Sequence, residues 1–183
     1  MNTSVSSKAG SLVFAFCLIA MVGGKHETVP PPQVPDGLKA PEGQVVLLKA
    51  RGHGVQIYTC KASANDPNSF AWSFKAPEAD LIEERGNNIG RHYAGPTWEA
   101  SDGSRVSGEV QQKAEAPKAG AIPWLLLKAK SHAGAGTFGR VLYIQRVDTE
   151  GGVAPVTGCD QAHFNNEVRV DYRADYYFYV SGR

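Results

Sequence analysis

The sequence has almost no net charge and no cluster of basic residues. Its formal net charge is +1 over 183 residues, and no two Lys or Arg residues are adjacent. Proteins that bind nucleic acids neutralise many phosphates and carry a basic patch or stripe. The absence of such a pattern predicts no nucleic-acid partner. The chain also lacks a repeat at a fixed period, which argues against a propeller or a solenoid.

Two motifs of catalytic sites are missing as well. The chain contains no G-x-S-x-G sequence, the elbow that presents a nucleophilic serine in α/β-hydrolases. Its two methionines are Met1 and Met21, and both lie in the N-terminal segment that we expect to be removed. A blue-copper site with an axial methionine is therefore excluded in the mature protein.

One glycine-rich motif matches a dinucleotide-binding pattern but lacks the required context. Residues 134–139 read GAGTFG, which fits the G-x-G-x-x-G pattern that holds a pyrophosphate between a strand and a helix. Here the motif is followed by Arg140–Val147, an alternating segment rich in β-forming residues, so no helix N-terminus is available. We interpret the motif as a flexible hairpin connection. We predict no NAD or other cofactor and no NAD-dependent dehydrogenase activity.

The first 24 residues have the layout of a secretory signal. Lys8 precedes an apolar run from Leu12 to Val22, which ends in the small residues Gly23 and Gly24. The run is roughly half as long as a helix that spans a bilayer. We therefore predict a signal peptide over residues 1–24, secretion to an extracellular or periplasmic location, and no membrane span after cleavage.

The remaining chain is divided by composition into a lead-in and one domain. Residues 25–43 contain five prolines and no apolar periodicity, which indicates an extended, proline-rich lead-in. Residues 44–183 are enough for a single domain with its own core.

The cysteines predict one disulfide bond. Of the three cysteines, Cys17 lies in the signal segment, which leaves Cys60 and Cys159. In an oxidising compartment an even pair of cysteines in a small exported domain favours a disulfide over a metal or catalytic site.

Short β-rich segments separated by Gly, Pro, Asn and Asp predict an all-β fold. The expected strands are Gln44–Ala50, Val55–Lys61, Phe70–Phe74, Ile89–Tyr93, Arg105–Ala114, Pro123–Lys130, Val141–Val147 and Val168–Val180. Only Glu78–Arg85 is compatible with a helical turn. We expect a single antiparallel β-sandwich or flattened barrel with little helix.

Alternation within the predicted strands indicates which side chains form the core. In the last strand one parity is expected to form the buried face: Val168, Val170, Tyr172, Ala174, Tyr176, Phe178 and Val180. Tyr177 and Tyr179, of the other parity, are expected to be half exposed. The other expected core residues are Trp72, Phe74, Leu125, Leu127, Leu142 and Ile144.

The densest group of polar and aromatic residues lies between Ile89 and Gly108. The candidate ligand-binding residues are His92, Tyr93, Trp98, Glu99, Asp102 and Ser104. These residues surround two turn signals, Gly95-Pro96 and Asp102-Gly103. Such a group can hold a polar ligand, with Trp98 as an apolar platform and the carboxylates as acceptors. The alternative is structural: Trp98 belongs to the core, Asp102 caps its own turn, and His92 satisfies a buried backbone group.

Two kinds of chemistry remain open for these residues. Glu99 and Asp102 could form the acid/base pair of a secreted hydrolase. His92, His132 and His163 could assemble a copper or zinc site, although no two of them have the spacing that places two imidazoles on one face of a helix or a strand. We predict that these three histidines do not converge and that the protein holds no metal.

Several separated motifs, in order along the chain, resemble one family of exported proteins. They are Val55–Cys60, Ala76–Ala79, His92–Glu99, Asp102–Ser104, Tyr143–Val147, Gly151–Pro155 and Ala174–Tyr179. They occur in a domain-of-unknown-function family, number 3455, that is found in bacteria, fungi and plants, and the resemblance runs from about residue 35 to residue 179. Fungal members are often labelled malate dehydrogenase. The resemblance implies export but assigns no catalytic residue.

These observations favour an exported, non-enzymatic module that binds a polar ligand such as cell-envelope or wall carbohydrate. The hydrolase and the copper or zinc protein are the alternatives.

Overall fold

The computed structural model describes residues 1–3 and 29–182. The signal peptide predicted over residues 1–24 lies outside the described residues, apart from the first three. No helix in the described part of the chain is long and apolar enough to cross a membrane.

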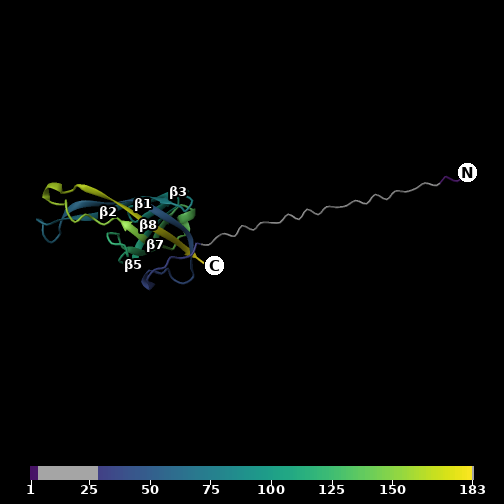
Figure 1. The fold of residues 1–183 in the computed structure, drawn as a ribbon, viewed down its shortest axis with the longest axis horizontal. Coiled ribbons are helices and arrows are strands. Elements are labelled where there is room, and N and C mark those ends of the chain that lie inside the picture. Colours follow the sequence, from purple (N-terminus) through teal and green to yellow (C-terminus); the bar gives the residue numbers. More distant parts are fainter. Residues whose placement is uncertain (4–28, 183) are drawn as a thin grey trace.

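Within residues 29–182 the chain forms eight antiparallel strands that close into one barrel (Figure 1). Each strand pairs with the next along the chain, and the last pairs with the first. The strands are β1 (Gln44–Ala62), β2 (Phe70–Ile82), β3 (Asn88–Tyr93), β4 (Thr97–Ala100), β5 (Arg105–Ala114), β6 (Trp124–Ala133), β7 (Tyr143–Gly151) and β8 (Glu167–Ser181). The described helices are the short 3-10 helices η1 (Asp36–Leu38), η2 (Thr137–Arg140) and η3 (Gln161–His163). The predicted all-β barrel with little helix is confirmed.

Three details of the strand prediction are wrong. Thr97–Ala100 forms a strand that was not predicted, and the suggested helical turn at Glu78–Arg85 is largely the end of β2. The two segments predicted on either side of Arg51–Gly54 form one continuous strand, β1. The glycines there allow close approach instead of a turn: a Cβ on Gly52 would lie 2.5 Å from the Tyr176 ring.

The barrel interior is filled by alternate residues of each strand. On β8 the predicted parity is confirmed in the middle of the strand, where Tyr172, Ala174, Tyr176 and Phe178 are buried in the main core. Toward the two ends of the strand, Val168, Val170 and Val180 are only partly buried. Of the other expected core residues, Leu127 and Ile144 are buried and Leu125 packs against the core.

Three expected core residues lie elsewhere. Phe74 is 55% exposed and Trp72 is only partly buried, because both lie where β2 extends beyond its pairing with β3. Leu142 is exposed just before β7. For these residues hydrophobicity alone did not indicate which face of the sheet would be covered.

The proline-rich lead-in packs on the outside of the barrel. Leu38 of η1 is buried, and the Gln145 amide donates a hydrogen bond to its carbonyl. Val34 and Ala40 pack against Tyr179 and its neighbours in a second apolar cluster. The lead-in therefore buries a face that would otherwise be open to solvent, and the prediction that Tyr177 and Tyr179 are half exposed is wrong.

Beyond the barrel, β1, β2 and β8 continue as a three-stranded extension, which we call the arm. β1 pairs with β2 as far as Ala62 and with β8 as far as Thr59, whereas β2 pairs with β3 only from Ala79 to Ile82. The predicted disulfide is confirmed: Cys60 of the arm is bonded to Cys159 of the loop between β7 and β8.

Candidate functional site

The predicted site residues lie on the hairpins β3–β4 and β4–β5, and their side chains point to opposite faces of the sheet. His92 pairs with Trp98, and Arg91 with Glu99, across the first hairpin. Successive residues of a strand point to opposite faces. His92 and Trp98 therefore face the interior, whereas Arg91 and Glu99 face outward.

His92 and Trp98 belong to the core. Their rings stack with centroids 4.4 Å apart, and they are 2% and 1% exposed. His92 Nδ1 lies 2.9 Å from the Thr97 carbonyl oxygen, to which it donates. Burial lowers the pKa of His92 to about 3, so that its ring is neutral at physiological pH. A ligand on the outer surface cannot stack on Trp98, so the proposed platform is wrong and the structural alternative describes both residues.

Tyr93 and Glu99 lie together on the outer face with Arg91. The Tyr93 hydroxyl donates to Glu99 Oε2 at 2.7 Å, and Arg91 Nη2 donates to Oε1 at 3.0 Å. These hydrogen bonds, first that of Tyr93 and then that of Arg91, lower the pKa of Glu99. The carboxylate is ionised at neutral pH and has a fixed orientation.

This trio lines an open hollow of about 660 Å³. The hollow lies where the arm meets the β3–β5 hairpins, and its charged or polar lining residues are His53, Glu78, Asp80, Arg91, His92, Tyr93, Glu99, Arg105 and Arg169. His92 contributes little surface to it, since it is 2% exposed. Glu78 is paired with Arg169. Among the described residues, Arg105 and Asp80 belong to no ion pair within the 4.0 Å limit, so both can meet a ligand.

Asp102 and Ser104 form a different structure, which ties two loops together. Asp102 Oδ1 accepts hydrogen bonds from the Ser104 backbone amide and hydroxyl. Asp102 Oδ2 accepts from the Thr137 amide and hydroxyl, both at 2.8 Å. Ser104 Oγ in turn accepts from the Phe138 amide at 2.9 Å.

This arrangement holds the glycine-rich segment 134–139 in place. The segment joins the antiparallel strands β6 and β7, as predicted, and contains the single 3-10 turn η2. Phe138 of that turn is fully buried and stacks on Phe178, with centroids 4.5 Å apart. The connection is therefore tied to the β4–β5 turn, and its Phe138 is part of the main core.

The two carboxylates are poorly suited to acid/base chemistry as a pair. A general acid needs a pKa raised toward the working pH. Hydrogen bonds lower the pKa of Glu99 and also that of Asp102, where those from Ser104 contribute most. Each is an ionised carboxylate that already accepts hydrogen bonds at both oxygens. The geometry does not favour the hydrolase alternative.

The Asp102 contacts predict an acid-dependent contribution to stability. A pKa lowered in the folded state stabilises the protein above the unfolded-state value of about 3.9, and this stabilisation is lost as the pH falls toward the folded-state pKa. Asp102→Asn should therefore lower the denaturant midpoint at pH 7, and its difference from wild type should shrink at pH 3. The control is Asp171→Asn on β8. A difference that is the same at both pH values would contradict the role of the charge.

The three histidines of the suggested metal site lie on different elements and contact different groups. His92 contacts Thr97, His132 Nε2 lies 2.7 Å from the Val141 carbonyl oxygen, and His163 Nδ1 lies 2.7 Å from an Asp160 carboxylate oxygen. In residues 1–3 and 29–182 no three His, Cys, Asp or Glu residues are grouped so as to hold a metal ion.

Sequence reasoning missed most of the residues that line the hollow. Arg91 and Arg105 lie within or beside the predicted patch, and the alternation of Arg91, Tyr93 and Glu99 could have placed them on one face. Asp80 and His53 carried no such signal. They reach the hollow because Asp80 of β2 pairs with His53 of β1 on one side and with Arg91 of β3 on the other.

A family model described as Protein of unknown function (DUF3455) matches residues 41–180 of the chain. The match spans every strand of the barrel, from β1 to nearly the end of β8. No curated protein and no solved structure matches the chain.

Proposed function

Since the chain belongs to this family of proteins of unknown function, its function has to be inferred from its own site, and we propose that it is a non-enzymatic module that binds a polar ligand in the outer hollow. The observation that carries the proposal is the combination of Tyr93, a fixed Glu99 carboxylate and an unpaired Arg105 around one open hollow. A cell-envelope or wall carbohydrate fits such a lining.

The lining offers both kinds of hydrogen-bonding group. Arg105 supplies donors in a planar fork, whereas Asp80 supplies acceptors. A carbohydrate carries hydroxyls that both donate and accept, and acidic or amino sugars add a charge for one of these two residues. The openness of the hollow suits one or more residues of a longer glycan rather than an enclosed small molecule.

Two features support a location outside the cytoplasm. The signal-like residues 1–24 predict export, and the Cys60–Cys159 disulfide is typical of proteins in oxidising compartments. A cell-envelope or wall ligand is available there.

The test is glycan-array binding followed by calorimetry with the best ligand and the mature protein. Loss of one hydrogen bond to a charged group is worth about 1.5–3 kcal/mol, so Arg105→Ala should weaken binding at least about tenfold, and Asp80→Asn should also weaken it. Lys128→Ala, on the outer face of β6, is the matched control and should bind as wild type does.

The outcomes separate the classes of function. Binding without product formation, sensitive to Arg105, supports the module. Release of reducing sugar ends, abolished by Glu99→Gln, would instead establish the hydrolase. Equal affinities for wild type, Arg105→Ala and Asp80→Asn would show that the hollow is not the site.

A further inference from the structure

A second group of polar residues lies inside the barrel and contains an arginine without a carboxylate. Arg146 of β7 has the inward parity of Ile144, and its Nε and Nη2 both donate to the Pro123 carbonyl oxygen, at 3.2 and 2.8 Å. No ion pair in the described part of the chain includes Arg146. Arg146 is partly buried, and withdrawing a cation from water has a cost that no negative charge offsets here.

Two donors in this interior also have no partner. Gln56 is 2% exposed and Trp98 is 1% exposed. Within the described residues, Gln56 Nε2 and Trp98 Nε1 form no hydrogen bond of good geometry, although the Gln56 side chain lies close enough to the Tyr172 hydroxyl to offset part of the rise that burial causes in the pKa of that group. Native proteins satisfy the large majority of buried polar atoms, so these two unpaired donors call for an acceptor.

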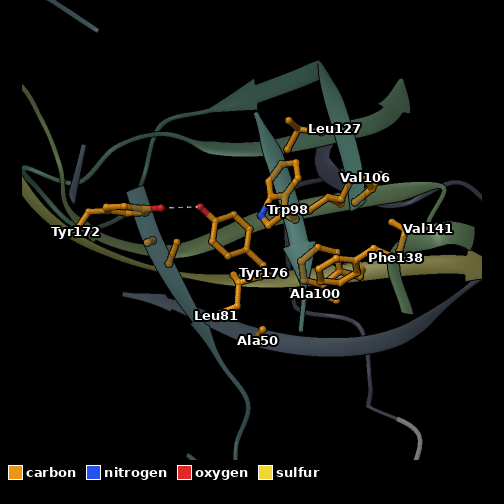
Figure 2. Packing of buried hydrophobic residues seen from close by; sticks show 14 of the residues in the cluster. Ala50, Leu81, Trp98, Ala100, Val106, Leu127, Phe138, Val141, Tyr172 and Tyr176 are labelled. Carbon is orange, nitrogen blue, oxygen red and sulfur yellow. Dashed lines mark hydrogen bonds between the residues drawn. The ribbon is translucent and has the colours of Figure 1, made fainter. Parts of the chain in front are cut away.

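Tyr172 and Tyr176 of the same interior add a further hydrogen-bond donor. The hydroxyl oxygens of Tyr172 and Tyr176 are 3.1 Å apart, and such a pair uses one hydroxyl proton and leaves the other free. Figure 2 shows the two hydroxyls directed toward each other, with the indole nitrogen of Trp98 on the side of its ring that faces Tyr176.

No negative charge arises within the group itself. Burial raises the pKa of Tyr172 and Tyr176, so both hydroxyls stay protonated, and the charge of Arg146 offsets only part of that rise. His92, which stacks on Trp98, is neutral and has Nδ1 bonded to the Thr97 carbonyl. The cluster therefore consists of one positive charge and several donors.

We propose that this interior cluster binds one small monovalent anion, of chloride or formate size, between the Arg146 guanidinium and the donors of Trp98, Tyr176 and Gln56. The single guanidinium charge favours a monoanion over a dianion.

The surrounding packing favours a small free ion over the end of a larger ligand. Gly152 lies so close over this part of the barrel that a Cβ there would be 2.9 Å from Tyr172 Cβ and 3.0 Å from Ile122 Cγ2. A larger carboxylate ligand would have to displace Gly152 and the side chains packed against it.

The test uses the mature protein dialysed into a buffer without halide or carboxylate. Sodium chloride, sodium formate, sodium butyrate and sodium sulfate are titrated at matched ionic strength, while the thermal midpoint, tryptophan fluorescence and the chlorine-35 NMR line width are measured. Chloride and formate should raise the midpoint in a saturable manner, and sulfate and butyrate should not. A response to butyrate alone would identify a larger carboxylate ligand and overturn the small-ion proposal.

Arg146→Gln removes the charge and keeps an amide donor near Pro123, and Arg140→Gln on the exposed η2 turn is the control with the same change in charge. Anion affinity should fall about tenfold or more in Arg146→Gln, as expected for loss of a charged hydrogen bond, and should be unchanged in Arg140→Gln. Equal salt responses in wild type and Arg146→Gln would overturn the proposal.

Trp98→Phe covers the case in which Arg146→Gln does not fold. It removes the indole donor and keeps an aromatic ring, so the chloride-dependent line width should decrease and chloride affinity should fall by several-fold. An unchanged line width and affinity in folded Trp98→Phe would also overturn the proposal.

Discussion

Replacing Trp98 with alanine is expected to lower the free energy of unfolding by about 3–5 kcal/mol. The indole is 1% exposed, stacks on His92, and makes edge contacts with Tyr176 at 5.6 Å and Phe178 at 6.2 Å between centroids. Truncation removes these contacts and leaves a cavity, because the closed barrel cannot collapse into it. Denaturant titration followed by circular dichroism measures the loss.

The controls distinguish a core residue from a ligand platform. Trp98→Phe keeps most of the buried ring and should cost much less. Trp72→Phe, at a partly buried tryptophan on the arm, should have a small effect. If Trp98→Ala unfolds at the wild-type denaturant concentration but no longer binds glycans, then Trp98 contacts the ligand and its assignment to the core is wrong.

Removing the disulfide is expected to destabilise the protein by up to about 4–5 kcal/mol. Cys60 and Cys159 are separated by 99 residues, and the chain-entropy model assigns this value to a loop of about that length. In the folded state the bond also holds the loop before β8 on the arm, where Trp72 Nε1 donates to the Thr157 carbonyl at 2.9 Å. The double variant Cys60→Ser/Cys159→Ser should therefore unfold earlier and alter the fluorescence of Trp72.

Reduction of the wild-type protein provides the matched experiment. A reducing agent should shift the denaturant midpoint of wild type toward that of the double variant and should leave the variant itself unchanged. Peptide maps made with and without reduction should differ by the fragment that joins Cys60 to Cys159. Identical maps would show that the bond does not form in the purified protein.

Much of the barrel could be predicted because its signals are local. Alternation in β8 identified Tyr172, Ala174, Tyr176 and Phe178 as one buried face, and turn residues marked most strand ends. Two cysteines outside the predicted signal peptide were enough to predict their bond. These inferences depend only on neighbouring residues or on a choice between very few partners.

The candidate site was harder to predict because one face of the β3–β4 hairpin is buried in the core and the other face lines the outer hollow. His92, Tyr93, Trp98 and Glu99 are close in sequence. Alternation along the two strands nevertheless buries His92 and Trp98 in the core and places Tyr93 and Glu99 at the hollow. In the sequence, Asp102 stands in the same polar and aromatic segment and was therefore predicted to be a ligand-binding carboxylate. It accepts hydrogen bonds from Ser104 in its own turn, as the structural alternative predicted, and from Thr137, which is 35 residues away.

Residue pattern and composition therefore predicted most of the strands and the disulfide pair, because these follow from short-range periodicity or from a choice between very few partners. The tertiary structure decided the rest. Pairing between neighbouring strands placed His53, Asp80, Arg91 and Glu99 in one row across β1–β4, and closure of the barrel gave Arg146 and Trp98 the same interior. Packing of the lead-in decided whether Tyr177 and Tyr179 were buried, since burial of a strand face depends on what the rest of the chain places against it.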